Sequence, residues 1–104
     1  MNNFDEELAK FKDIVFNQPI IKEYFKIKME IAENDYLKDL QDKIVFYAQE
    51  MTKNVNNDDV YLASKEKYET YLKEYNSNPL VINLHEISKE VENTLLELKN
   101  ILEN

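Results

Sequence analysis

Apolar residues recur at every third or fourth position along most of this 104-residue chain. That spacing places them on one face of an α-helix, and five such stripes follow one another with polar segments between them. The stripes consist of Phe4, Leu8, Phe11 and Val15; Ile20, Tyr24, Ile27 and Ile31; Leu37, Leu40, Ile44, Tyr47, Met51 and Val55; Val60, Tyr61, Tyr68, Tyr71, Leu72 and Tyr75; and Leu80, Leu84, Ile87, Val91, Leu95, Leu98 and Leu102. The pattern predicts an all-α fold, a bundle of about five helices with a long C-terminal helix.

The chain's two prolines each precede the same apolar pattern, at an offset of 60 residues. Proline suits the first position of a helix, where its missing N–H would have no partner. Either the two helices have similar packing roles, or any amphipathic helix that starts at a proline looks this way. The aligned pairs are Pro19 with Pro79, Ile20 with Leu80, Ile21 with Val81, Tyr24 with Leu84, Ile27 with Ile87 and Ile31 with Val91.

Asparagine and aspartate between the stripes predict the other helix starts, because their side chains can accept a hydrogen bond from the first turn. Asn34 or Asp35 can cap the third helix. The polar cluster 54–59 is expected to be a loop in which Asp58 or Asp59 caps the fourth helix.

Composition restricts the class of protein. A chain of this length fits a single helical domain over residues 1–104. The absence of cysteine excludes disulfides and thiolate-bound metals or clusters, and the absence of glycine excludes the usual phosphate loops. All 13 basic residues are lysine, so there is no guanidinium clamp. The net charge of −8 opposes direct nucleic-acid binding, since binders present a basic face to phosphate.

The chain shows no sign of a membrane segment. Its N-terminus, MNNFDEELAK, is acidic where a signal peptide would be basic and then apolar. The longest apolar run, 44–48, falls far short of the ~20 residues of a membrane helix. We therefore expect a cytoplasmic protein without membrane insertion.

Residues that could carry chemistry do not form a recognisable motif. The single histidine, His85, lacks a Glu-x-x-His partner because Ile82 precedes it by three, and we expect it at the surface. The stretch 54–58 resembles the start of a calcium loop, but Asp59 stands where glycine is needed and Lys65 where glutamate is needed. A capped helix–helix loop is expected there. The carboxylates mostly alternate with lysines, which is typical of solvated faces. We expect no enzymatic activity, no metal and no cofactor.

Tyrosine is the most informative residue type, with 7 in the chain. Four of them, Tyr61, Tyr68, Tyr71 and Tyr75, lie on the fourth predicted helix. They can form a core stripe whose hydroxyls reach the rim, or a partner-binding patch, since tyrosine is enriched at interface hot spots. Contact with a second copy would satisfy both interpretations.

The junction between the fourth and fifth helices resembles the YlbF/YmcA family, the control-of-competence regulators. Residues 75–102 read YNSNPLVINLHEISKEVENTLLELKNIL, similar to the family's Asn-Pro helix start, polar–apolar helix and Leu/Ile-rich end. Residues 17–31, NQPIIKEYFKIKMEI, and 40–51, LQDKIVFYAQEM, resemble the family's second and third helices. The resemblance runs from about Phe4 to Leu102 and includes uncharacterised branches such as the YheA-like proteins.

The resemblance implies a small all-helical bacterial cytoplasmic protein without enzymatic activity. Members of the family regulate competence, sporulation and biofilm formation through protein partners. Some form a complex that modulates the messenger-RNA-cleaving ribonuclease Y. The iron–sulfur clusters of certain members are bound through cysteines, so that property does not carry over to this chain.

Two functions from different classes remain open: a regulatory adaptor that binds other proteins, and a structural helical protein that assembles with itself. The aromatic content of 12% and the wide stripes predict a homo-oligomer, most simply a dimer. The expected contact is the aromatic face of the fourth helix or the long fifth helix. A strict heptad through the fifth helix would include the polar Thr94, which favours a globular bundle over a two-stranded coiled coil.

Overall fold

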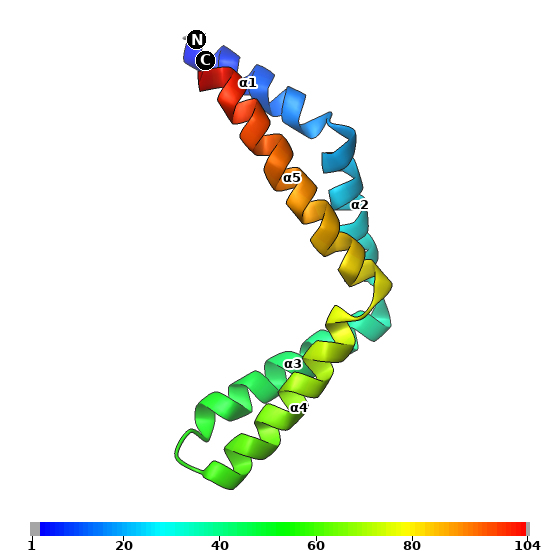
Figure 1. The fold of residues 1–104 in the computed structure, drawn as a ribbon, viewed down its shortest axis with the longest axis vertical. Helices are drawn as coiled ribbons and strands as arrows, with labels where there is room; N and C mark the ends of the chain where they lie inside the picture. The colour runs from blue at the N-terminus through cyan, green and yellow to red at the C-terminus, as the bar shows by residue number, and fades with distance from the viewer. Residues whose placement is uncertain (1–2, 104) are drawn as a thin grey trace. The chain divides into compact units, whose positions relative to one another are not determined.

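The computed structural model describes residues 3–103, which are helical apart from four short junctions. The helices are α1 (Asn3–Phe16), α2 (Pro19–Glu33), α3 (Asp35–Lys53), α4 (Asp58–Asn76) and α5 (Pro79–Glu103) (Figure 1). With 25 residues, α5 is the longest, so the predicted all-α fold with a long C-terminal helix is confirmed. Within the described residues, no helix has both the length and the apolar character needed to cross a bilayer.

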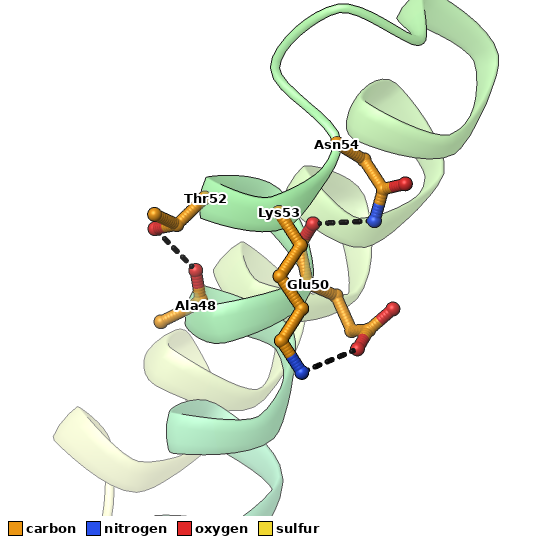
Figure 2. Close-up of polar contacts among 5 residues, drawn as sticks. All are labelled: Ala48, Glu50, Thr52, Lys53 and Asn54. Carbon is orange, nitrogen blue, oxygen red and sulfur yellow. Dashed lines mark hydrogen bonds and ion pairs between the residues drawn. The ribbon is translucent and has the colours of Figure 1, made fainter.

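Helix ends in this structure are closed without left-handed backbone, since no residue from 3 to 103 has a positive φ. The last turn of α3 shows how (Figure 2). The side-chain Nδ2 of Asn54 donates to the Glu50 carbonyl at 2.8 Å, and the Asn54 backbone N–H donates to the same oxygen at 3.1 Å. Thr52 Oγ1 donates to the Ala48 carbonyl at 3.1 Å, and Lys53 Nζ lies 3.8 Å from a Glu50 carboxylate oxygen. The two Asn54 donors thus reach one of the last four carbonyls of the helix, which have no partner within it, whereas the Thr52 bond and the Lys53–Glu50 ion pair join groups inside the last two turns.

The same arrangement ends α1. Asn17 Nδ2 donates to the Asp13 carbonyl at 2.7 Å, and the Asn17 backbone N–H donates to that oxygen at 3.1 Å. At the end of α4, Ser77 Oγ donates to the Glu74 carbonyl at 2.9 Å. Amide and hydroxyl side chains therefore donate to the last carbonyls of these helices, which at many other helix ends accept hydrogen bonds from a turn that contains glycine.

Asparagine also starts three of the helices. Asn34, Asn57 and Asn78 directly precede α3, α4 and α5, and the side-chain oxygen of each accepts a hydrogen bond from a first-turn N–H, at 3.0, 3.4 and 2.9 Å respectively. Such caps satisfy donors that have no partner within the helix. The choice between two predicted caps of α3 is thereby decided in favour of Asn34.

The prediction that Asp58 or Asp59 caps α4 is wrong. The helix already begins at Asp58, because Asn57 has the extended backbone of a cap and accepts from the first turn. The two aspartates instead lie in the first turn, where a carboxylate interacts favourably with the helix dipole. Val55, predicted to continue the third stripe, lies beyond the end of α3.

The repetition of one apolar pattern after each proline, which we call the 60-residue echo, extends to the burial of the side chains. Both α2 and α5 start at a proline after a two-residue junction, and burial over 18–27 matches burial over 78–87 position by position. The echo extends into the preceding helices, since the half-buried Phe11 and Val15 of α1 correspond to the half-buried Tyr71 and Tyr75 of α4. The most deeply buried aligned pairs are Ile21 with Val81 and Ile27 with Ile87.

The chain forms two compact units, and α2 and α5 contribute to both. The second unit, Met29–Ile82, contains α3 and α4, which form an antiparallel hairpin and the closest helix pairing of the described residues (Figure 1). The buried apolar side chains of this unit are Ile31, Leu37, Leu40 and Val81, with the buried polar Ser64 on α4.

The first unit consists of the chain up to Lys28 and from Asn83 onward. Here α1 lies beside the C-terminal part of α5, and a cavity of about 250 Å³ between them is lined by Phe4, Leu8, Phe11 and Leu102, among others. No described residue of α1 is buried. The buried apolar side chains of this unit, Ile21, Ile27 and Ile87, lie on α2 and α5, whereas α1 packs through partly exposed apolar side chains.

The junction before α5 allows a direct test of capping, because its two residues have different roles. Asn78→Ala removes the side-chain acceptor for the Leu80 N–H and should lower the free energy of unfolding by about 1 kcal/mol. Pro79→Ala is the matched control and should change it by less than ~0.5 kcal/mol, since alanine is also accepted at the first helical position. Urea unfolding followed by circular dichroism measures both. A loss of ~3 kcal/mol for Pro79→Ala would contradict the position of the helix start.

Candidate functional site

The four tyrosines predicted to bind a partner are all half-buried on α4, the helix that pairs with α3. Tyr71 stacks on Tyr47 of α3, with ring centroids 5.8 Å apart and an interplanar angle of 21°. Lys43 Nζ lies 5.2 Å from the centroid of the Tyr71 ring. Such stacked rings and a cation above a ring add to the stability that burial of the rings provides. Tyr71 is therefore part of the seam between the two helices.

Two hydrogen bonds between side chains also join α3 to α4. Gln41 Nε2 donates to the Tyr75 hydroxyl at 2.8 Å, and the Tyr36 hydroxyl donates to a Glu74 carboxylate oxygen. Both are at exposed positions, and the Tyr36 side chain itself is 52% exposed. Tyr75 thus has a partner on α3, which supports the interpretation of Tyr71 and Tyr75 as core stripe residues.

The other two tyrosines face a cavity at the opposite end of the seam. Tyr61 and Tyr68 line a space of about 340 Å³ together with residues of α3 and of the loop after it, namely Ala48, Met51, Thr52 and Val55. Their rings are therefore only partly covered by α3. Partner binding by the four tyrosines as a group stays a prediction.

The polar contacts of the seam change two pKa values. The pKa of Tyr36 is raised above its ordinary value, first by the hydrogen bond to Glu74 and then by desolvation and by the negative charge of that carboxylate. The pKa of Lys43 is also raised, chiefly by its hydrogen bond to Asp39, whose carboxylate lies 2.9 Å from Nζ. Both groups are held in their protonated forms by a carboxylate neighbour.

A second candidate site lies in the first unit, where α1, α2 and α5 surround a cavity of about 470 Å³. Phe16 and Phe25 lie at its edge, 56% and 46% exposed, with ring centroids 6.3 Å apart. Phe25 also meets the Tyr24 ring edge to face at 5.4 Å. We call this space the α1–α2–α5 groove; its lining residues are Val15, Phe16, Ile21, Tyr24, Phe25, Ser88, Val91, Glu92 and Leu95.

The remaining sequence expectations concern catalytic and metal sites. His85 is exposed, as predicted, and residues 54–57 form the predicted capped helix–helix loop. Among residues 3–103, no group of three or more His, Asp or Glu side chains is arranged to hold a metal ion. Aromatic and apolar side chains make up most of the lining of both candidate sites, and such side chains suit recognition by contact.

The apolar stripes do not single out the seam partners or the groove. Tyr47 and Tyr71 are 24 residues apart in the sequence, and no local pattern predicts that their rings stack. A signal for the groove does exist in the echo. Phe16 and Phe25 are aromatic where the second half of the chain has Asn76 and His85.

Comparison of the chain with protein-family models, with curated proteins and with solved structures finds no match. The resemblance of residues 75–102 to the YlbF/YmcA family therefore stays a proposal.

The raised pKa of Tyr36 predicts a pH dependence of stability. A group whose pKa is raised by folding stabilises the fold below its unfolded pKa, and this contribution is lost as the pH rises through the folded pKa. We therefore expect the urea midpoint to fall as the pH rises above 10.0, the ordinary tyrosine value. Tyr36→Phe should make that fall smaller, while the part due to Lys43 remains.

Tyr68→Phe is the control, since it removes a tyrosine hydroxyl and leaves the bond between Tyr36 and Glu74 in place. An equal alkaline fall in wild type and Tyr36→Phe would show that this bond does not stabilise the folded state.

Proposed function

We propose that this protein is a non-enzymatic, cytoplasmic regulatory protein that acts by binding other proteins. The observation that supports this is the exposure of large apolar and aromatic side chains. In the described residues, seventeen of them are exposed, whereas the buried apolar core has seven members. Exposed apolar side chains mark an interaction site where they gather, as Phe4, Leu8 and Leu102 do around one cavity and Phe16, Phe25 and Leu95 around another.

The regulatory role follows the resemblance to the YlbF/YmcA family. On this proposal the protein takes part in control of competence, sporulation or biofilm formation, through a complex that modulates a ribonuclease Y-type enzyme. The net charge of −8 supports action on a protein rather than on the RNA, since an acidic chain is repelled by phosphate. The Asn78 cap and the proline start of α5 agree with the Asn-Pro helix start of that family.

Self-assembly is the second candidate function, and α5 carries the observation that favours it. Leu96, Ile101 and Leu102 are 56%, 71% and 64% exposed near the end of this helix. The tyrosines of α4 have less surface to offer, because Tyr71 and Tyr75 already contact α3. We propose a homodimer whose contact includes α5, and this state is compatible with the regulatory role.

Affinity purification of the tagged protein from its native cytoplasm, followed by mass spectrometry, tests the regulatory role. We expect components of a ribonuclease Y-type complex to be enriched over a tag-only control. Recovery of the tagged chain alone, at low and physiological salt, would contradict the proposed function.

Light scattering at micromolar concentration tests self-association. We expect about twice the monomer mass of 12.5 kDa. Ile101→Lys on α5 should shift the mass toward the monomer, because it places a charge in the apolar contact. Val45→Lys changes a side chain of α3 that is 54% exposed and should leave the dimer intact. A monomer mass for the wild type would exclude the homodimer.

A further inference from the structure

The two halves of the chain differ at the edge of the α1–α2–α5 groove. Deeper lining residues have apolar equivalents at the 60-residue offset, as Ile21 has in Val81 and Tyr24 in Leu84. The residues at the edge do not. The pairs that differ are Phe16 with Asn76, Phe25 with His85 and Leu95 with Asp35.

This difference indicates that the helix start can form without large apolar side chains at the groove edge. Asn76, His85 and Asp35 are exposed and polar. The start of α5 at Pro79, which corresponds to the start of α2 at Pro19, forms with the polar Asn76 and His85 at these positions. The groove residues Phe16 and Phe25 remain 56% and 46% exposed, so about half of the surface of each side chain stays in contact with water. Large apolar side chains that the junction does not require, and that stay exposed beside a cavity, are the composition of a docking surface.

The stretch of α1 and α2 that lines the groove, residues 10–28, is a basic part of an acidic chain, whereas the α5 wall carries Glu86, Glu90 and Glu92 against Lys89. Residues 10–28 contain five lysines against Asp13 and Glu23, a net charge of +3, which leaves −11 for the rest of a chain of net charge −8. Lys12 precedes Phe16 by four residues, so the two lie on one face of α1. On α2, Lys22 precedes Phe25 by three residues and Lys28 follows it by three.

These lysines are available for a partner. Neither Lys12 nor Lys22 forms an ion pair with another described residue, and Lys28 Nζ lies over the Tyr24 ring, 5.3 Å from its centroid. Glu92 is the acidic residue that lines the groove, on its α5 side. The α1 and α2 sides therefore combine exposed aromatic rings with positive charge.

The walls of the groove favour a helical occupant. All three walls are helices, whose backbone groups are used within the helix, so no strand can be added to an edge. Of the polar lining groups, the Ser88 hydroxyl already donates to the Leu84 carbonyl at 2.7 Å. A small polar ligand usually needs several converging polar groups, whereas an amphipathic helix needs apolar pockets for side chains one turn apart.

We propose that the α1–α2–α5 groove binds an amphipathic helix of a partner protein, whose bulky apolar side chains enter between Phe16 and Phe25 and whose acidic residues face Lys12, Lys22 and Lys28. The proposal rests on the proposed function, because it names the surface and the partner chemistry of a protein that acts by binding others. Charge complementarity sets the specificity, and the aromatic rings provide most of the contact area.

Two synthetic peptides test the charge of the partner. Both are fluorescein-labelled helices with the same leucine and phenylalanine side chains at helical spacing; one has glutamate at the flanking positions and the other lysine. Fluorescence polarisation measures their binding to the full chain at physiological salt. We expect the glutamate peptide to bind about tenfold more tightly, a difference of about 1.4 kcal/mol. Equal binding, tighter binding of the lysine peptide, or no binding of either would overturn the proposal.

A matched pair of variants tests the site. Phe25→His places at the groove edge the residue that the second half of the chain has there, and it should weaken binding of the glutamate peptide about tenfold. Phe46→His is the control, because Phe46 is 52% exposed on α3 and meets a neighbouring tyrosine edge to face at 5.0 Å, much as Phe25 does. Lys22→Glu, on the surface of α2, should weaken binding of the glutamate peptide and strengthen binding of the lysine peptide.

An equal effect of Phe25→His and Phe46→His would overturn the groove as the site. Loss of self-association in Phe25→His, without peptide binding by the wild type, would show that a second copy occupies the groove and would also overturn the proposal. Retention of cytoplasmic partners by Phe25→His in the affinity purification would reject the groove and leave the proposed function standing.

Discussion

Side chains close the helix ends of this protein, because the chain has no glycine to end a helix with a left-handed residue. Asparagine does most of this work, with its amide nitrogen at the ends of α1 and α3 and its side-chain oxygen at the starts of α3, α4 and α5. At the helix starts these oxygens accept from N–H groups that have no partner within the helix, and at the helix ends the amide nitrogen adds a second bond to a carbonyl that the backbone N–H already reaches. Junctions of one to four residues are therefore sufficient.

The two compact units use different interactions. In the described residues, the hydrogen bonds between side chains of different helices join α3 to α4, and the stacked pair of Tyr47 and Tyr71 lies in the same seam. The first unit has instead the α1–α2–α5 groove and no buried residue on α1. Since segments with few buried apolar contacts open at lower free energy than the rest of a protein, α1 is expected to separate from its neighbours more easily than α2 or α5. In the proposed complex, a partner helix fills the groove without breaking the side-chain hydrogen bonds between helices, which lie between α3 and α4.

Much of the fold could be predicted from residue spacing. The stripes predict the five helices, and the prolines predict the starts of α2 and α5, because both signals act within one or two helical turns. The cap of α4 could not be predicted from spacing alone. Asn57, Asp58 and Asp59 are all good caps, and only the path of the backbone from Asn54 shows which of them lies outside the helix. The candidate site was even harder to predict from the sequence, since the aromatic stripe of α4 is compatible with a core and with an interface.

The sequence by itself determined the helices and their apolar faces, because a stripe at a period of 3.6 residues depends only on which residues follow one another. It also contained the echo, and with it the difference between Phe25 and His85. Only the tertiary structure decided which members of a stripe are covered. Phe4 and Leu37 each begin a stripe, yet Phe4 is 68% exposed and Leu37 is 0% exposed. The reason is physical: a pattern defines the face that a helix presents, whereas burial requires a second surface close enough to exclude water, and residues distant in the sequence provide that surface.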